Sequence, residues 1–370
     1  MITAELRRAI VAAAGHDDAD PLLRPGPVPG SYASSLPFRL AQGSGQDPRD
    51  IAAVLAARLG REPWVAAAQV TGPGYLTVTV TRDTLAGLAV RIARAGPACA
   101  ASGALRGCTV TGPAGIDLAA EPDWPRARAA LAARLTARLA AAAGATVIFS
   151  AERSVVSPSR PSPASPDPAE RSVASPSRPA PPGPADAEGP LAPSGGPPPP
   201  RGAGPVAAAI GYAGEDAVRF ALARTSPGAA PPPAPVIARH LLTNPAYAVR
   251  YAHAAAAAVL RWAAALGAGP SGPEDSRPRH LAGLSGPEEL ALLDALSWLP
   301  ERVAMAARRG RPDEFAGYVE GLAARTMETM STTGFRKVPS SSERLWLADA
   351  ARVGLAASLG LLEVSAPDRL

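Results

Sequence analysis

A proline-rich segment limits what this chain can fold into. Residues 154–205 contain 17 prolines in 52 positions and no aromatic side chain. A segment so poor in large apolar groups cannot bury enough surface to offset the entropy that it would lose on ordering. We therefore expect 154–205 to be a disordered linker with extended polyproline conformations, which separates an amino-terminal part from a carboxy-terminal part.

The amino-terminal part mixes helical and strand patterns. Asp47 is placed to cap a helix, Pro48 suits the first helical position, and Gly60 would stop the helix. Apolar residues then alternate with threonines over 75–80, which is typical of a half-buried strand. These patterns predict an α+β domain over 1–110.

The carboxy-terminal part, 206–370, contains helical patterns alone. Ser285 and Glu288, and likewise Ser340 and Glu343, have the spacing of a capping box, which marks a helix start. Pro300 should interrupt one helix. Several such helices within this length predict an all-α bundle, so the fold class is a multi-domain chain with an α+β domain, a linker and a helical bundle.

Charge and composition exclude several classes of partner. The net charge is +5, but 206–370 carries 17 basic and 16 acidic residues, so we expect no DNA partner. The alanine-rich tract at 254–260 ends at Arg261, too short to span a bilayer. With no signal-peptide core after Met1 either, we expect a cytoplasmic protein with no membrane partner. Two isolated cysteines predict no metal site and no cofactor.

One predicted helix carries an unusual set of polar aromatic side chains. Asn244 and Pro245 specify its start, and Tyr247 and Tyr251 then lie on one stripe with Ala254 and Ala258. A second stripe, predicted to face the core, consists of Val249, Ala256, Val259 and Leu260. Two interpretations remain open. The tyrosines either pack against a neighbouring helix with their hydroxyl groups at the rim, or stack on unpaired bases, as aromatic rings do in RNA-binding proteins.

Several motifs carry a family resemblance. The stretches are "EDAVRFALAR", "NPAYAVRYAHA", "GRPDEFAGYVEGLAA" and "LAASLGLLEVSAPDRL", and nearer the start "GSYASSLPFRLAQGSGQDPRDIAAVLAARL" and "VTGPGYLTVTV". In order and spacing, the first four resemble the anticodon-binding domain that closes arginyl-tRNA synthetases. The other two resemble the amino-terminal domain with which the same enzymes bind the tRNA elbow.

The resemblance implies a set of tRNA-binding residues. The anticodon contacts fall on the 244–262 helix and the elbow contact on the amino-terminal domain. In this sequence these residues are Asn244, Tyr247, Arg250, Tyr251, His253 and Tyr32. Apart from the resemblance, the basic residues Arg336 and Lys337 either form a solvated surface or contact phosphate groups of the tRNA. An aromatic pair usual in the family after the position of Leu322 is replaced by "ARTMETMS".

The catalytic centre of the family is missing from its expected place. Residues 111–153 resemble the eroded first βα unit of the class I catalytic domain, without the histidines of its His-x-Gly-His signature. Lys337 is the sole lysine and lies in the bundle, so the lysine loop that stabilises the ATP phosphates is absent too. We therefore predict that the chain has no catalytic residues.

Three functions follow as hypotheses. We favour a tRNA-binding protein, with tRNA-Arg as the first candidate ligand, that has no aminoacylation activity of its own. The alternative is a protein-interaction module that has lost tRNA binding and has a protein partner. The third, an active arginine-tRNA ligase, conflicts with the missing histidines and lysine.

Overall fold

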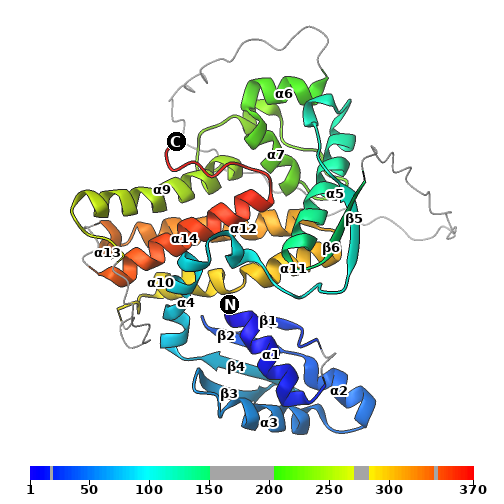
Figure 1. The fold of residues 1–370 in the computed structure, drawn as a ribbon, viewed down its shortest axis with the longest axis vertical. Helices are drawn as coiled ribbons and strands as arrows, with labels where there is room; N and C mark the ends of the chain where they lie inside the picture. Colours follow the sequence, from blue (N-terminus) through cyan, green and yellow to red (C-terminus); the bar gives the residue numbers. More distant parts are fainter. Residues whose placement is uncertain (17–19, 151–203, 271–282, 337–340) are drawn as a thin grey trace, which may run out of the picture.

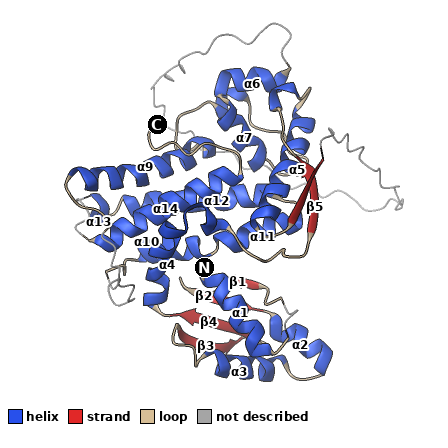
Figure 2. Ribbon diagram, viewed as in Figure 1, coloured by secondary structure: helices blue, strands red, loops and turns tan. Residues whose placement is uncertain are grey.

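The computed structural model describes residues 1–16, 20–150, 204–270, 283–336 and 341–370. Within them, a sheet domain lies at one end of the molecule and a helical bundle occupies the rest (Figure 1). The predicted linker lies outside the described residues except for its last two, of which Pro205 already begins a helix. The α+β domain and the helical bundle are confirmed as predicted, and strands occupy two separate places (Figure 2).

The sheet domain is an antiparallel sheet packed with helices. Its strands lie in the order β1-β2-β4-β3. Helices α2 and α3 contact strand β4, α3 also contacts β3, and α1 packs on α3. The elements are α1 (Ile2–Ala14), β1 (Leu23–Pro25), β2 (Ser31–Ser34), α2 (Leu36–Ser44), α3 (Pro48–Leu59), β3 (Val65–Thr71) and β4 (Tyr75–Val80).

Two of these elements follow directly from local sequence. The side chain of Asp47 accepts a hydrogen bond from the Arg49 amide and caps α3, with Pro48 in its first turn. In β4, Leu76, Val78 and Val80 are buried as predicted, but Thr77 between them is buried as well, so the alternation is incomplete there. Both the predicted helix and the predicted strand are confirmed.

The next elements lead from the sheet domain to the bundle. Helix α4 (Arg82–Ala95) and the 3-10 turn η1 (Gly96–Ala100) pack against helices of the bundle. After them, β5 (Thr109–Pro113), η2 (Leu118–Ala120), α5 (Trp124–Ala142) and β6 (Thr146–Ser150) form a small β-α-β unit. Its two strands are parallel. A Cβ at Gly112 would lie 2.5 Å from that of Ala137, so this glycine lets β5 lie close against α5.

The bundle is built from helices that bury alanine- and leucine-rich faces. Helix α9 packs on α12 and α14, and α10 and α11 pack on α12. The elements are α6 (Pro205–Ala213), α7 (Glu215–Arg224), α8 (Ala234–Ile237), α9 (Pro245–Ala265), α10 (Pro287–Ser297), α11 (Leu299–Arg309), α12 (Pro312–Met330), α13 (Thr333–Arg336) and α14 (Ser342–Leu361).

Of the helix boundaries predicted in the bundle, one is confirmed and one is displaced by a residue. Pro300 lies in the first turn of α11, directly after α10 ends, so the predicted interruption is confirmed. The capping box predicted at Ser285 and Glu288 is wrong by one residue. It is the Glu289 carboxylate that accepts hydrogen bonds from the backbone amides of residues 285 and 286, at 3.0 Å each. Ser340, of the second predicted box, lies outside the described residues.

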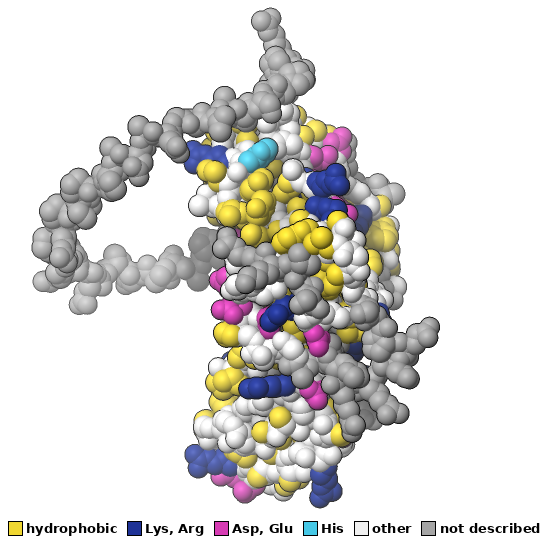
Figure 3. Space-filling model, turned by 90° about the vertical axis from the view of Figure 1, so that its left-hand side faces the viewer, with side chains coloured by type: hydrophobic (Ala, Val, Ile, Leu, Met, Phe, Trp, Pro, Cys, Tyr) yellow, Lys and Arg dark blue, Asp and Glu magenta, His cyan; other side chains and the backbone are white. Residues whose placement is uncertain are grey.

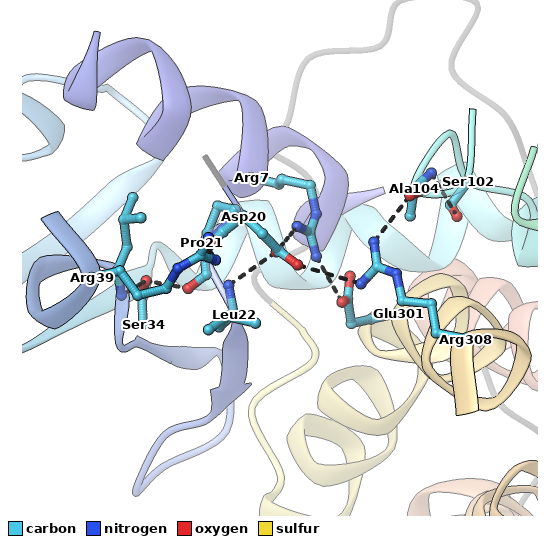
Figure 4. A network of polar contacts seen from close by, with 11 residues as sticks. Arg7, Asp20, Pro21, Leu22, Ser34, Arg39, Ser102, Ala104, Glu301 and Arg308 are labelled. Carbon is cyan, nitrogen blue, oxygen red and sulfur yellow. Dashed lines mark hydrogen bonds and ion pairs between the residues drawn. The ribbon is translucent and has the colours of Figure 1, made fainter. Parts of the chain in front are cut away.

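A polar network joins the sheet domain to the bundle (Figure 4). Arg7 of α1 pairs with Asp20 and, at 2.7 Å, with Glu301 of α11. Arg308, also from α11, reaches Asp20 at 3.5 Å. Burial opposes the charge on Asp20, but the hydrogen bond and attraction of Arg7 outweigh it and lower the pKa of the carboxyl group. The network therefore carries ionised groups from both parts and holds α1 against α11.

The Glu363 carboxylate ties the β-α-β unit to the end of the bundle. It accepts hydrogen bonds at 2.8 Å from Arg134 of α5 and from Arg219 of α7. Arg138, one turn along α5, lies 3.4 Å from it. The residue follows α14 with a φ of 57°, a left-handed backbone conformation that turns the chain into its carboxy-terminal tail. Three elements distant in sequence thus meet at one side chain.

Candidate functional site

Three aromatic rings form a continuous stack at the amino-terminal end of α9. His240, which precedes the helix, stacks on Tyr247 with ring centroids 5.3 Å apart and an interplanar angle of 14°. Tyr247 in turn stacks on Tyr251 at 5.7 Å and 29°. Tyr251 is 37% exposed and His240 is also exposed, whereas Tyr247 between them is partly covered. The two outer residues of this ring stack are therefore accessible to solvent.

Asn244 positions the ring stack through the backbone. Its side-chain oxygen accepts a hydrogen bond from the Ala246 amide and caps α9. Its amide nitrogen donates to the carbonyl groups of Ile237 and Arg239, at 2.8 and 2.6 Å. These two carbonyl groups belong to the residues just before His240. One buried asparagine therefore fixes both the start of the helix and the loop that carries the first ring. Its side chain is 9% exposed, which corrects the prediction that Asn244 itself contacts RNA.

Arg250 and His253 face another side of α9, toward the carboxy-terminal tail. The Arg250 guanidinium lies 3.6 Å from the Asp216 carboxylate and 3.4 Å from the Ser365 hydroxyl. Nδ1 of His253 donates to the Pro367 carbonyl at 3.0 Å, and this side chain is 1% exposed. The Arg250 side chain is 27% exposed, and its guanidinium group is engaged by Asp216 and Ser365. The tail takes up the polar groups of both Arg250 and His253.

The surroundings of His253 favour its neutral form. Burial lowers the pKa of the imidazole below its ordinary value of 6.5, although the Pro367 carbonyl and the Asp368 carboxylate pull it upward. Arg352 of α14 adds a small further lowering. A neutral ring with Nδ1 protonated satisfies the tail carbonyl, which can only accept a hydrogen bond. The geometry thus gives His253 a structural role, in place of the predicted contact with a base.

Tyr32 has a place that the sequence did not reveal. Its side chain is 1% exposed, its ring lies 5.2 Å from that of Trp298, and its hydroxyl group donates to Ser297 at 2.8 Å. Ring and hydroxyl are both used in packing the sheet domain on α10, so we do not retain Tyr32 as an elbow contact. Of the predicted basic pair, Arg336 ends α13, and Lys337 lies outside the described residues.

His240 is the member of the site that sequence reasoning missed. It follows the proline-rich run "PPPAPVIAR" and lies outside the periodic stripe of α9, so helical spacing could not place it. The available signal was its position four residues before the Asn244 cap, where a short loop must turn back over the first helical turn. With His240 as a third ring, the stack is longer than the pair of tyrosines that the sequence predicted.

Charged side chains of both signs share the face of the molecule that Figure 3 shows. On the face that Figure 3 shows, Lys and Arg side chains lie in small separate groups beside Asp and Glu, and hydrophobic side chains gather over the helical upper part. Among the described residues, His, Cys, Asp and Glu form no group suited to hold a metal ion. No helix in that part of the chain combines the length and apolarity needed to cross a membrane.

Two known protein families match the ends of the chain. Residues 1–80 match the arginyl tRNA synthetase N terminal domain, and residues 249–370 match the DALR anticodon binding domain. The second match includes Tyr251 and begins two residues after Tyr247.

Individual relatives agree with these two families. The arginine–tRNA ligase of Frankia alni is 35% identical over 164 residues, which are 42% of this chain and 29% of the ligase. That of Clavibacter sepedonicus is 37% identical over 166 residues, 42% and 28% of the two chains. The matched part of the chain thus spans less than a third of the length of these relatives.

A solved structure shares the fold. It is the arginyl-tRNA synthetase of Thermus thermophilus, with a TM-score of 0.63, 16% identity and coverage of 100% of both chains. The two families match the amino-terminal and the carboxy-terminal part, as the sequence motifs indicated. The chain is therefore an arginyl-tRNA synthetase-related protein.

Proposed function

We propose that this chain binds tRNA through the ring stack of His240, Tyr247 and Tyr251. The observation that carries the proposal is the stack itself, whose two outer residues, His240 and Tyr251, are exposed. Unpaired bases stack on such faces whatever their sequence, and each stacked base contributes ~1–3 kcal/mol. The neighbouring match to an anticodon-binding domain supports a tRNA anticodon loop as the source of those bases. Because the relatives are named arginine–tRNA ligases, tRNA-Arg is the first ligand to test.

We further propose that the chain does not aminoacylate tRNA by itself. Activation of the amino acid, in which its carboxylate attacks the α-phosphate of ATP and pyrophosphate leaves, requires cations or donors positioned around the phosphates. Between the two matched families, the described residues form α4, the β-α-β unit, α6, α7, α8 and the start of α9. The β-α-β unit, which occupies the place of the catalytic domain, contains neither histidine nor lysine. Incubation with ATP, arginine and tRNA should therefore yield no arginyl-tRNA above background. Turnover that survives removal of contaminating synthetase would overturn this part. We expect binding to occur in the cytoplasm, where tRNA is charged.

The binding experiment compares three tyrosine variants of the full chain by fluorescence anisotropy with labelled tRNA. Tyr251→Ala removes the last ring of the stack and should weaken binding about tenfold or more, since one lost stacking contact is worth ~1–3 kcal/mol. Tyr251→Phe keeps the ring and should bind like the wild type. Tyr212→Ala is the matched control, because Tyr212 of α6 is 48% exposed and takes no part in the ring stack.

Stability separates binding from packing. The alternative interpretation, in which the tyrosines merely pack, predicts that Tyr251→Ala lowers the melting temperature while the tRNA affinity at low temperature stays unchanged. That result would remove the ring stack from RNA binding. Substitution of an arginine that binds a phosphate group would have a different effect. It would weaken the binding of all RNAs alike, and it would reduce the steepness of log affinity against log salt concentration by about one.

A protein-interaction module is the second candidate function. The observation that favours it is the exposed surface of α9 beyond the ring stack, where Trp262 and Leu266 are 45% and 58% exposed. Isolated exposed apolar side chains are common, but a contiguous row of them marks an interaction surface. The two functions can coexist if the two ends of the helix serve different partners.

A further inference from the structure

One stripe of α9 is apolar over the whole length of the helix. Each of its members is uncharged and is either exposed or partly exposed. They are Tyr247, Tyr251, Ala255, Ala258, Trp262 and Leu266. At 100° per residue they fall within about a third of the helix circumference. Leu266 directly follows the last helical residue. We name this set the α9 stripe.

The charged side chains of the same helix lie elsewhere. Arg250 is held by Asp216 and Ser365, and Arg261 donates to the Asp368 carbonyl at 2.6 Å. Both thus face the carboxy-terminal tail. Phosphate groups that bind along the carboxy-terminal half of the α9 stripe would find no cation among its members. An uncharged surface suits an apolar partner better than a nucleic acid backbone.

The α9 stripe is symmetric in both spacing and size. Its members are separated by four, four, three, four and four residues, and they run large, large, small, small, large, large. Read backward, the series is the same. The centre lies between Ala255 and Ala258. If two copies of α9 cross there in antiparallel orientation, Tyr247 meets Leu266 of the other copy and Tyr251 meets Trp262. Such self-complementarity is what a twofold interface requires.

Size and shape also suit a helix pair. Alanines at the crossing allow two helix axes to approach to about 8 Å, and rows of residues four apart are the ridges that interlock in helix packing. Aromatic rings on both sides of the crossing supply large contact areas and pair well with one another. The helix has 21 residues, and Leu241 and Leu242, just before its start, are 54% and 57% exposed.

We propose that two copies of this chain associate through the α9 stripe, as antiparallel helices that cross at Ala255 and Ala258. The inference goes beyond the proposed function, and it shares two side chains with it. Tyr247 and Tyr251 belong both to the ring stack and to the α9 stripe. A base stacked on these rings and the helix of a second copy therefore exclude each other. Self-association should oppose tRNA binding, and saturating tRNA should shift the protein toward monomers.

The test measures the mass of the full chain by sedimentation or light scattering over a range of protein concentrations. The wild type should pass from monomer to dimer as the concentration rises. Ala258→Arg places a charge at the crossing point of each copy and should weaken dimerisation at least tenfold. Trp262→Glu, which places a carboxylate against the rings of the other copy, should do the same. Ala264→Arg is the matched control, because Ala264 is exposed on α9 but lies off the stripe, and this variant should dimerise like the wild type.

Circular dichroism and melting temperature establish that each variant is folded. A wild type that stays monomeric at every soluble concentration overturns the proposal, and so does dimerisation that both stripe variants leave unchanged. These outcomes are distinct from failure of the proposed function. Ala258→Arg keeps His240, Tyr247 and Tyr251, so it should bind tRNA at least as well as the wild type. A monomeric wild type that binds tRNA refutes the pairing alone, and a dimer that ignores tRNA refutes the ring stack alone.

Discussion

Tyr32 donates a hydrogen bond from its hydroxyl group to the Ser297 side chain at 2.8 Å, across the interface between the sheet domain and α10. The hydroxyl group of Ser297 in turn donates a hydrogen bond to the Asp294 carbonyl at 2.7 Å. Both side chains are buried. Removal of one partner leaves a buried polar group unsatisfied, which costs ~1–3 kcal/mol.

Tyr32→Phe should therefore lower the free energy of unfolding by about 1 kcal/mol in urea titrations. The ring still packs on Trp298, so the loss reports the hydroxyl group alone. The tRNA affinity should not change, since the side chain is enclosed between two parts of the protein. A variant of normal stability with weakened tRNA binding would instead restore Tyr32 as an RNA contact.

The difference between the predicted and the observed role of Tyr32 shows where sequence reasoning stops. Asp47 and Pro48 were placed correctly because a helix cap depends on residues two or three positions away. The partner of Tyr32 is 265 positions distant. No periodicity or local motif records such a contact, since it depends on how two separately folded parts dock.

Asn244 combines two roles that substitutions can separate. Asn244→Ser keeps an acceptor for the first turn of α9 but cannot reach the Ile237 and Arg239 carbonyls. Asn244→Ala loses the cap as well, so it should be less stable than the serine variant by about 1 kcal/mol. Thermal unfolding of the two variants measures this difference, and equal stabilities would show that the cap contributes nothing.

The serine variant also tests the positioning of His240. With its loop no longer held, His240 should stack less well on Tyr247, and tRNA affinity should fall although residue 244 touches no ligand. His240→Ala provides the comparison. If the ring stack binds RNA as a unit, adding Asn244→Ser to His240→Ala should weaken binding little further, because the two changes act on the same ring. Fully additive losses would argue against a positioning role.

Glu363 and Glu215 form a matched pair of carboxylates, because both accept hydrogen bonds from Arg219. The Glu363 side chain is 18% exposed and also holds Arg134 and Arg138, whereas the Glu215 side chain is 54% exposed. Glu363→Gln should lower the free energy of unfolding by about 2 kcal/mol, since it leaves enclosed guanidinium groups without their counter-charge. Glu215→Gln should cost less than about 0.5 kcal/mol. Equal effects in urea titrations would refute the anchoring role of Glu363.

The 244–262 helix itself was predictable, but the roles of its side chains were only partly so. Spacing correctly placed Tyr247 and Tyr251 on one stripe, but Ala254 of that stripe is buried. On the predicted core side, Val249 and Ala256 are buried, and Val259 and Leu260 are partly buried against the core. Spacing could not show that a carboxy-terminal tail covers the side with Arg250 and His253. A helical wheel reports which residues share a face, and the rest of the chain decides which faces stay open.

His253 makes the attachment of the tail depend on pH. The pKa of its imidazole is lowered in the folded protein, chiefly by burial, from an ordinary value of 6.5. Between these two pKa values the unfolded chain binds a proton that the folded chain does not, so stability falls as pH falls below 6.5. The slope reaches at most ~1.4 kcal/mol per pH unit for one group.

Asn in place of His253 retains a donor near Nδ1 and cannot titrate. Urea unfolding of the wild type and of His253→Asn at about pH 7.5 and about pH 5.5 should therefore show a smaller loss on acidification for the variant. His240→Asn is the control, because that histidine is exposed and its removal should leave the pH dependence of stability as in the wild type. If His253→Asn loses as much stability on acidification as the wild type, the buried imidazole does not govern the tail, and the acid sensitivity arises elsewhere in the protein.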